Sequence, residues 1–323
     1  MKKNIAIIGG GYSSEYEVSL RSAETVFASM DREKYNLYRV ILEKNAWTAL
    51  LPDGKTAPVD KSNFSFQQDG AVITIDFAYI TVHGAPGEDG RLQGYFDLLH
   101  IPYSSCGVLA SALTFNKYVC NRFLRSQGIL VSDSIRLRRG DAVETDGIIA
   151  RLGLPVFVKP NDSGSSFGVS KVKEAGRMQE AIETALGEGN EVIIERFIPG
   201  VEVTCGCYKV RGQVVVFPLT EVLPANDFFD YSAKYKGESQ EITPARLSAE
   251  LSDRIRQETA TIYDLVGAKG IIRVDYIVPA DEKPVLLEVN TTPGMTATSF
   301  IPQQILAAGL EIKDVMTDII ENR

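Results

Sequence analysis

The sequence has few of the residues that characterise several large classes of protein. Its 323 residues include only four cysteines, too few for a disulfide scaffold. Lys and Arg number 34 against 42 Asp and Glu, a net charge of -8, so no basic excess exists to neutralise nucleic-acid phosphates. No apolar run approaches the roughly 18 residues of a membrane span. We therefore expect a soluble cytoplasmic protein without nucleic-acid or membrane partners.

The overall composition is that of a globular protein. Hydrophobic residues make up 44% and charged residues 24%, values typical of a packed core. The length exceeds the roughly 250–300 residues at which single cores stop growing, which indicates two or three units. Continuous apolar runs alternate with helical periodicity in the first hundred residues, a pattern that predicts a parallel sheet with covering helices.

Apolar periodicity places the expected elements along the chain. The expected strands cover residues 5–8, 37–42, 77–82, 156–159, 192–196, 270–278 and 285–289, with a hairpin formed by 201–210 and 213–219. The expected helices cover residues 18–30, 90–99, 111–127, 174–186 and 248–266, and two more close the chain. The polar stretch 224–244 is too long for an ordinary connection and is predicted to be a lid or binding loop.

A glycine turn follows the first strand, at Gly9–Gly11. Backbone N–H groups at such a turn suit an anion, and the turn partly matches a dinucleotide-binding fingerprint, although Ser14 occupies the third glycine position. Glu17 argues against a bound pyrophosphate and favours an ammonium group. An NAD-dependent oxidoreductase stays an alternative at this point, as does a non-catalytic nucleotide sensor.

Lys159 ends an apolar strand and is followed by a Gly/Ser loop, 164–168. A buried lysine requires an anion, and the loop offers donors to phosphate oxygens. The alternative is a surface lysine beside a flexible loop. His83 lies in a glycine-rich loop after a strand, where ligands bind in α/β sheets, although a lone histidine is more often structural.

Two strands carry a pattern of acidic and amide side chains. Alternation places Arg273 with Asp275 on one strand face, and Glu288 with Asn290 on another. If the strands pair, the carboxylates converge and require a cation, and oxygen ligands favour Mg²⁺ over Zn²⁺. The alternative is a salt bridge from Asp275 to Arg273 with Glu288 facing solvent. Cys205 and Cys207 also share a strand face, but without further ligands nearby they are predicted to be two buried thiols.

Taken together, these motifs resemble the D-alanine–D-alanine ligase family of the ATP-grasp superfamily. The resemblance covers nearly the whole chain and rests on six segments: GGGYSSEYEVSL (9–20), HGAPGEDGRLQG (83–94), VKPNDSGSSFG (158–168), DYSAKY (230–235), RVD (273–275) and EVNTTPGMTATS (288–299). Phe300 and Phe167 depart from the commonest family residues, leucine and valine.

The resemblance implies an α/β fold of three domains: a Rossmann-like N-terminal domain, 1–112, and two ATP-grasp subdomains, 113–212 and 213–323, with the lid at 224–244. It implies ATP-dependent, ADP-forming ligation of two D-alanine molecules through an acyl phosphate, for peptidoglycan precursor synthesis. A related ligase that uses D-lactate or D-serine as second substrate is the alternative. The resemblance further implies two Mg²⁺ ions, with Mn²⁺ as an alternative ion, and a homodimer.

The resemblance also implies roles for individual residues. The residues implied to bind ATP are Lys117, Lys159, Ser166, Glu195, Phe197, Ile198, Glu202 and Lys234. The implied metal ligands are Asp275, Glu288 and Asn290. Glu17 would bind the first ammonium group and join Ser165 and Tyr235 in a hydrogen-bonded set, with His83 nearby. Arg273 and the Gly294 N–H would stabilise the oxyanion, and Ser299 and Phe300 would hold the second carboxylate.

Overall fold

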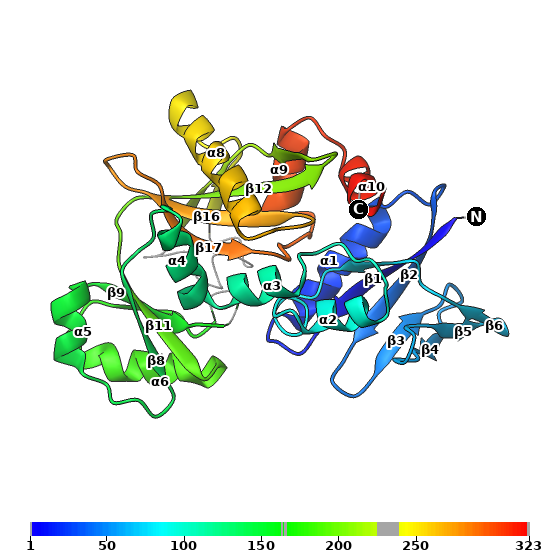
Figure 1. Cartoon of the computed structure of the whole chain (residues 1–323), viewed down its shortest axis with the longest axis horizontal. Coiled ribbons are helices and arrows are strands. Elements are labelled where there is room, and N and C mark those ends of the chain that lie inside the picture. The colour runs from blue at the N-terminus through cyan, green and yellow to red at the C-terminus, as the bar shows by residue number, and fades with distance from the viewer. Residues whose placement is uncertain (1, 163, 165–166, 225–238, 322–323) are drawn as a thin grey trace.

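The strands of the protein form three larger sheets with helices around them (Figure 1). The computed structural model describes residues 2–162, 164, 167–224 and 239–321. A small additional hairpin joins β5 (Phe66–Gln68) to β6 (Ala71–Ile73). The expected α/β class is confirmed. Within the described ranges, no helix has the length and apolar character needed to cross a membrane.

The N-terminal sheet combines parallel and antiparallel strands. Its order is β4-β3-β2-β1-β7, formed by β1 (Lys3–Gly10), β2 (Tyr35–Leu42), β3 (Trp47–Leu50), β4 (Thr56–Pro58) and β7 (Phe77–Ile80). β1 runs parallel to both β2 and β7, as predicted, whereas β3 and β4 add an antiparallel edge that was not predicted. The covering helices are α1 (Tyr16–Ser29) and α2 (Arg91–Leu98).

The helix predicted at 111–127 is in fact two helices, α3 (Val108–Phe115) and α4 (Lys117–Ser126). Asn116 separates them in an extended conformation, and its side chain accepts the Val119 N–H at 3.0 Å. Asparagine is a favoured residue for capping a helix N-terminus in this way. The break makes Lys117 the first residue of α4.

The central sheet is antiparallel and has its own core. Its order is β10-β9-β11-β8, formed by β8 (Ser134–Arg138), β9 (Val156–Pro160), β10 (Ser170–Val172) and β11 (Glu191–Arg196). The associated helices are α5 (Thr145–Leu152), the short 3₁₀ helix η1 (Ala175–Arg177) and α6 (Met178–Glu188). The buried cluster beneath them contains only residues of this unit.

The C-terminal sheet has the order β15-β14-β12-β16-β17, with β13 paired to β12. Its strands are β12 (Val201–Val210), β13 (Gln213–Val216), β14 (Thr220–Pro224), β15 (Ser239–Ile242), β16 (Ile272–Val278) and β17 (Val285–Asn290). Its helices are α8 (Ala249–Leu265), α9 (Phe300–Ala307) and α10 (Ile312–Glu321). The β12–β13 hairpin confirms the predicted one.

Two features of this sheet correct the sequence analysis. The boundary expected at 212/213 falls inside the β12–β13 hairpin, where Val210 pairs with Gln213. The expected lid loop 224–244 contains a strand, because β15 pairs with β14 with Pro224 opposite Ser239. Residues 225–238, which include Lys234 and Tyr235, lie outside the described residues. A polar strand at a sheet edge has no apolar alternation by which to recognise it.

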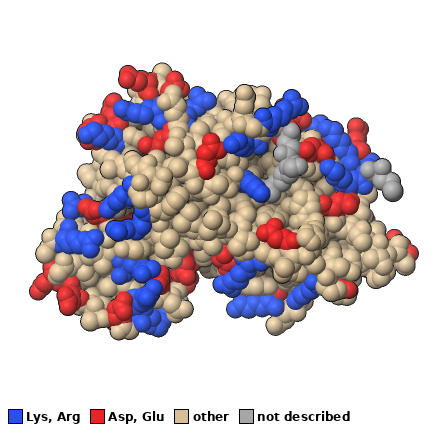
Figure 2. Space-filling model, viewed as in Figure 1, with Lys and Arg blue, Asp and Glu red and all other residues tan. Residues whose placement is uncertain are grey.

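Buried apolar clusters join the units to one another. One cluster combines β1 and α1 with α9 and α10, through residues such as Ile7, Val26, Ile301 and Ile319; Figure 1 shows α10 beside α1. Another packs α3 and α4 against the C-terminal sheet. On the face drawn in Figure 2, basic and acidic side chains are interspersed.

Candidate active site

The three units meet at an open pocket. The residues that line it come from segments far apart in the sequence: Glu15, His83, Glu88, Gly164, Glu241, Arg273, Glu288, Asn290, Thr292, Pro293, Gly294, Thr296, Thr298, Ser299 and Phe300. A smaller hollow continues from it toward Lys117. Seven of the predicted site residues line the pocket, and Lys117 lines the smaller hollow.

Glu15, and not Glu17, carries its carboxylate into this pocket. Glu15 precedes the first residue of α1 and is 7% exposed, whereas Glu17 is exposed on that helix. Two residues along a helix turn the side chain by about 200°, so the two glutamates face opposite ways. A Cβ on Gly164 would overlap Glu15 Oε2, so the Gly/Ser loop reaches this carboxylate only because glycine stands there. This geometry favours Glu15 over the predicted Glu17 as the ligand of an ammonium group in the pocket.

His83 is buried and held by two hydrogen bonds. Its Nδ1 lies 2.8 Å from the Thr292 carbonyl, and its Nε2 lies 3.0 Å from Ser22 Oγ. Because a carbonyl only accepts, Nδ1 carries the proton and Nε2 accepts from the serine hydroxyl. Burial lowers the pKa of His83, so the imidazole is neutral.

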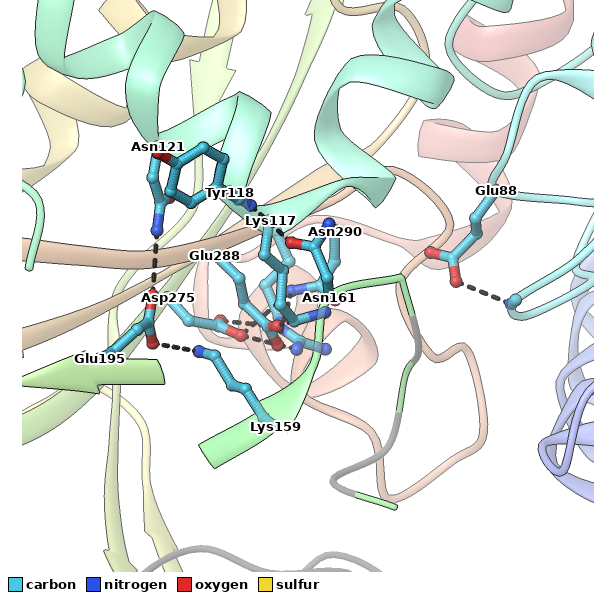
Figure 3. Close-up of polar contacts among 12 residues, drawn as sticks. Glu88, Lys117, Tyr118, Asn121, Lys159, Asn161, Glu195, Asp275, Glu288 and Asn290 are labelled. Carbon is cyan, nitrogen blue, oxygen red and sulfur yellow. Dashed lines mark hydrogen bonds and ion pairs between the residues drawn. The ribbon is translucent and has the colours of Figure 1, made fainter. Parts of the chain in front are cut away.

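Glu88 is a buried acid that the sequence analysis did not single out. Its Oε2 accepts the Gly84 N–H at 2.7 Å, and its Oε1 accepts the Thr292 N–H at 3.3 Å. Burial, with Glu15 nearby, raises the pKa of Glu88 to about 8. Figure 3 shows Glu88 on its own loop, apart from the cluster around Glu288. Its place in the motif HGAPGEDG was the available signal.

The predicted metal ligands converge across the β16–β17 pair. Asp275 is the register partner of Glu288, and Arg273 of Asn290. Asn290 Nδ2 lies 3.1 Å from Asp275 Oδ2 and 3.5 Å from Glu288 Oε1. Arg273 also binds Asp275 through two bonds of 2.8 and 2.7 Å, so the salt bridge considered as an alternative is present as well. Glu288, however, does not face solvent but pairs with Lys117 at 3.4 Å.

This donor set fits a hard divalent cation. Two carboxylates and an amide oxygen are oxygen ligands of the kind that Mg²⁺ takes, usually completed by water and substrate phosphates. Among the described residues, no group of three or more His, Cys, Asp and Glu is arranged to hold a metal by itself. Water and phosphate oxygens would complete the coordination.

A row of alternating charges leads from this acid pair toward the central sheet (Figure 3). Lys159 Nζ lies 2.5 Å from Glu195 Oε2, and Asn121 donates to the other oxygen of Glu195 at 3.1 Å. Burial disfavours the charged form of Lys159, but Glu195 and Glu288 outweigh it and raise the Lys159 pKa. Lys159 is therefore a buried, charged lysine beside the metal ligands, as a phosphate-binding role requires.

The other predicted nucleotide residues lie around this row. Phe197 and Ile198 follow β11, the Phe197 N–H donates to the Pro155 carbonyl at 3.2 Å, and Glu202 lies on β12. Ser165 and Ser166 lie outside the described residues.

The predicted second-substrate residues form the start of α9. Ser299 is the N-cap residue of this helix, but its Oγ makes no hydrogen bond to the helix and instead accepts the preceding Thr296 N–H at 3.1 Å. A Cβ on Gly294 would lie 2.9 Å from Ser299 Oγ, so the Gly294 backbone passes close to the cap. The Arg273 guanidinium lies 5.4 Å from the centre of the Phe300 ring. A helix N-terminus beside an arginine suits a carboxylate.

The fold and pocket define a ligase of the ATP-grasp class. The chain matches the family models for the D-ala D-ala ligase N-terminus over residues 4–106 and C-terminus over residues 123–321. It belongs to the D-alanine–D-alanine ligase family, which confirms the resemblance, and it is an ATP-dependent, Mg²⁺-requiring ligase.

Individual relatives agree with this family. The chain is 63% identical over 322 residues to a D-alanine–D-alanine ligase of Parabacteroides distasonis, covering 100% of this chain and 98% of the relative. Among solved structures, the VanG D-Ala:D-Ser ligase of Enterococcus faecalis matches with a TM-score of 0.88, 34% identity and 99% coverage of both chains. A Bacillus anthracis D-alanine–D-alanine ligase complexed with ATP matches with a TM-score of 0.79, 30% identity and coverage of 99% and 97%.

Proposed function

We propose that this chain joins two D-alanine molecules through an acyl phosphate, with Glu15, Arg273 and Gly294 acting on the amino acids. The observation that carries the proposal is the convergence of Asp275, Glu288 and Asn290 at one pocket between lysines and an anion-binding helix end. The identity to D-alanine–D-alanine ligases supports the choice of substrate.

In the first step, a carboxylate oxygen of the first D-alanine attacks the γ-phosphorus of ATP, and ADP leaves. Glu15 binds the substrate ammonium, which orients the carboxylate. Lys117 and Lys159 contact phosphate oxygens once nucleotide displaces their present partners, Glu288 and Glu195. Mg²⁺ held by Asp275, Glu288 and Asn290 would neutralise charge on the transferring phosphoryl group.

In the second step, the amine of the second D-alanine attacks the acyl carbon, releasing inorganic phosphate and a proton. Arg273 and the Gly294 N–H stabilise the oxyanion that forms, the largest single contribution in many acyl transfers. Ser299 and the Phe300 backbone hold the second carboxylate at the start of α9.

Water would hydrolyse the acyl phosphate, so the pocket must exclude solvent during turnover. Family resemblance alone assigns Ser165 and Tyr235 to this closure, and Ser166 and Lys234 to ATP. The same resemblance supports a homodimer and action in the cytoplasm, where the dipeptide serves peptidoglycan precursor synthesis.

A D-serine or D-lactate ligase is the alternative function. The match to a D-Ala:D-Ser ligase at 34% identity shows that the fold serves that specificity too. The much higher identity to D-alanine–D-alanine ligases, 63% over the whole chain, favours D-alanine as second substrate.

An ADP-release assay with product analysis tests the proposal. We expect ADP and D-alanyl-D-alanine with D-alanine, Mg²⁺ and ATP, little product with L-alanine or D-lactate, and no turnover after chelation of divalent ions. Glu288→Gln should require more Mg²⁺ for the same rate. Absence of ADP release above background with D-alanine would refute the function, and D-alanyl-D-lactate or D-alanyl-D-serine as main product would establish the alternative.

A further inference from the structure

The loop that carries Gly294 is tied to the N-terminal unit on both sides of that glycine. On one side, Thr292 donates its N–H to Glu88 and accepts from His83 through its carbonyl. On the other side, the Met295 N–H donates to Ser22 Oγ at 3.3 Å. The Ser22 hydroxyl in turn donates to His83 Nε2. Three hydrogen bonds thus bracket Gly294 within four residues.

Burial and further hydrogen bonds hold in place the groups that make these bonds. Ser22 is fully buried on α1, and Glu88 is anchored by the Gly84 N–H. The Met295 side chain belongs to the cluster that α1 shares with α9. The loop therefore takes its position from the N-terminal unit, although it follows a strand of the C-terminal sheet.

We propose that Glu88 and Ser22 are positioning residues that hold the Gly294 N–H where the oxyanion forms, acting through the backbone of Thr292 and Met295. This inference rests on the proposed function, in which Gly294 is an oxyanion donor. Neither side chain needs to touch substrate for this role, and His83 then serves as a neutral bridge between Ser22 and the Thr292 carbonyl.

The expected effect follows from the sensitivity of acyl transfer to donor placement. Loss of one oxyanion donor costs roughly 10²–10³-fold in rate, and a misplacement of about 1 Å costs on the order of 10²-fold. Loosening one side of the loop should cost less than complete loss. The nucleotide residues Lys159 and Glu195 lie on the central sheet, so binding of ATP should change little.

The experiment compares Ser22→Ala, Glu88→Ala and the double variant with the wild-type enzyme. We expect dipeptide formation to fall about 10- to 100-fold in each single variant, with KM for ATP within about threefold. Acyl phosphate formation, followed by ¹⁸O exchange between bridging and non-bridging positions of ATP, should also stay within about threefold. Because both residues act on one loop, the double variant should lose less than the product of the single losses.

Thr259→Val is the matched control. Its hydroxyl makes a buried hydrogen bond to Tyr276 at 2.9 Å, away from the loop, so this variant should lose stability without a selective loss of dipeptide formation. If Glu88→Ala does not fold, Glu88→Gln keeps the volume and one acceptor oxygen, and an intermediate loss is expected. Equal losses of isotope exchange and dipeptide formation, or dipeptide formation within threefold of wild type, would overturn the proposal. A wild-type enzyme inactive with D-alanine would instead overturn the proposed function.

Discussion

The correction from Glu17 to Glu15 makes a sharp prediction, because the two residues form a matched pair. Glu15→Gln and Glu17→Gln each remove one negative charge and keep the side-chain volume, two residues apart in the chain. Only Glu15 lines the pocket, beside His83 and Gly164. We expect Glu15→Gln to impair catalysis and Glu17→Gln to leave it nearly unchanged.

The magnitude follows from the burial of the two side chains. A hydrogen bond to a charged group contributes about 1.5–3 kcal/mol, and a buried charge that loses its partner costs about 3–5 kcal/mol. With Glu15 7% exposed, the substrate ammonium would lose its counter-charge in a poorly solvated site. At 1.36 kcal/mol per factor of ten, we expect kcat/KM for D-alanine to fall by about 10- to 5 × 10³-fold. An exposed substitution such as Glu17→Gln changes stability by about 0.5 kcal/mol or less, so it should alter the rate less than threefold.

The assay is coupled ADP release at varied D-alanine concentration, with ATP saturating. A thermal melt of both variants separates loss of the fold from loss of the site. The assignment fails if Glu17→Gln loses as much activity as Glu15→Gln, or if both stay within threefold of wild type. Loss confined to Glu17→Gln would restore the original sequence prediction.

Three further predictions concern other parts of the molecule. Arg273→Ala should reduce dipeptide formation at least 10²-fold by removing an oxyanion partner, and Arg273→Lys should recover little because it lacks the planar fork; near-normal product by mass spectrometry would contradict this role. Burial raises the pKa of Glu258 on α8 to about 6. The folded state therefore keeps a proton that the unfolded chain loses near pH 4.5, and stability falls as pH rises across that interval. In denaturant titrations, the free energy of unfolding of Glu258→Gln minus that of wild type should be about 1 kcal/mol larger at pH 8 than at pH 4.5, after allowance for partial exposure. Parallel curves of unfolding free energy against pH for the two proteins would refute this. All four cysteines are buried, and burial raises the pKa of Cys120 and of Cys205 to about 12. A disulfide thiol reagent at pH 8 should therefore label four thiols after unfolding and none before. Rapid labelling of the native enzyme would be inconsistent with this burial.

The sequence was most informative where the chain is buried on both faces. The short apolar run of β1, which ends at glycines, and the alternation in β16 and β17 favour strands, and the structure has strands at all three places. The pairing that brings Asp275 opposite Glu288 was an assumption in the sequence analysis. The register of β16 and β17 in the structure shows this pairing, which cannot be predicted from the local sequence of either strand.

The errors have physical causes at particular residues. Asn116 interrupts an apolar helical pattern because its side chain caps the next helix. Hydrophobic periodicity is read over a window of many residues, so it does not detect a break caused by one side chain. Glu15 and Glu17 differ only in their position relative to the start of α1, and helix boundaries are the least certain feature of a sequence prediction. Glu88 shares its motif with His83, but its contact with Thr292, 204 residues distant, arises only from tertiary packing.

The cluster shared by α1, α9 and α10 has a consequence for how the enzyme is assembled. It combines buried residues of β1 and α1 with buried residues of α9 and α10, so a fragment that lacks either pair of elements cannot form this cluster. The central sheet, with a separate interior, is under no such constraint. During synthesis, this cluster can therefore form only after α10 has left the ribosome, whereas the central sheet is complete in sequence more than a hundred residues earlier.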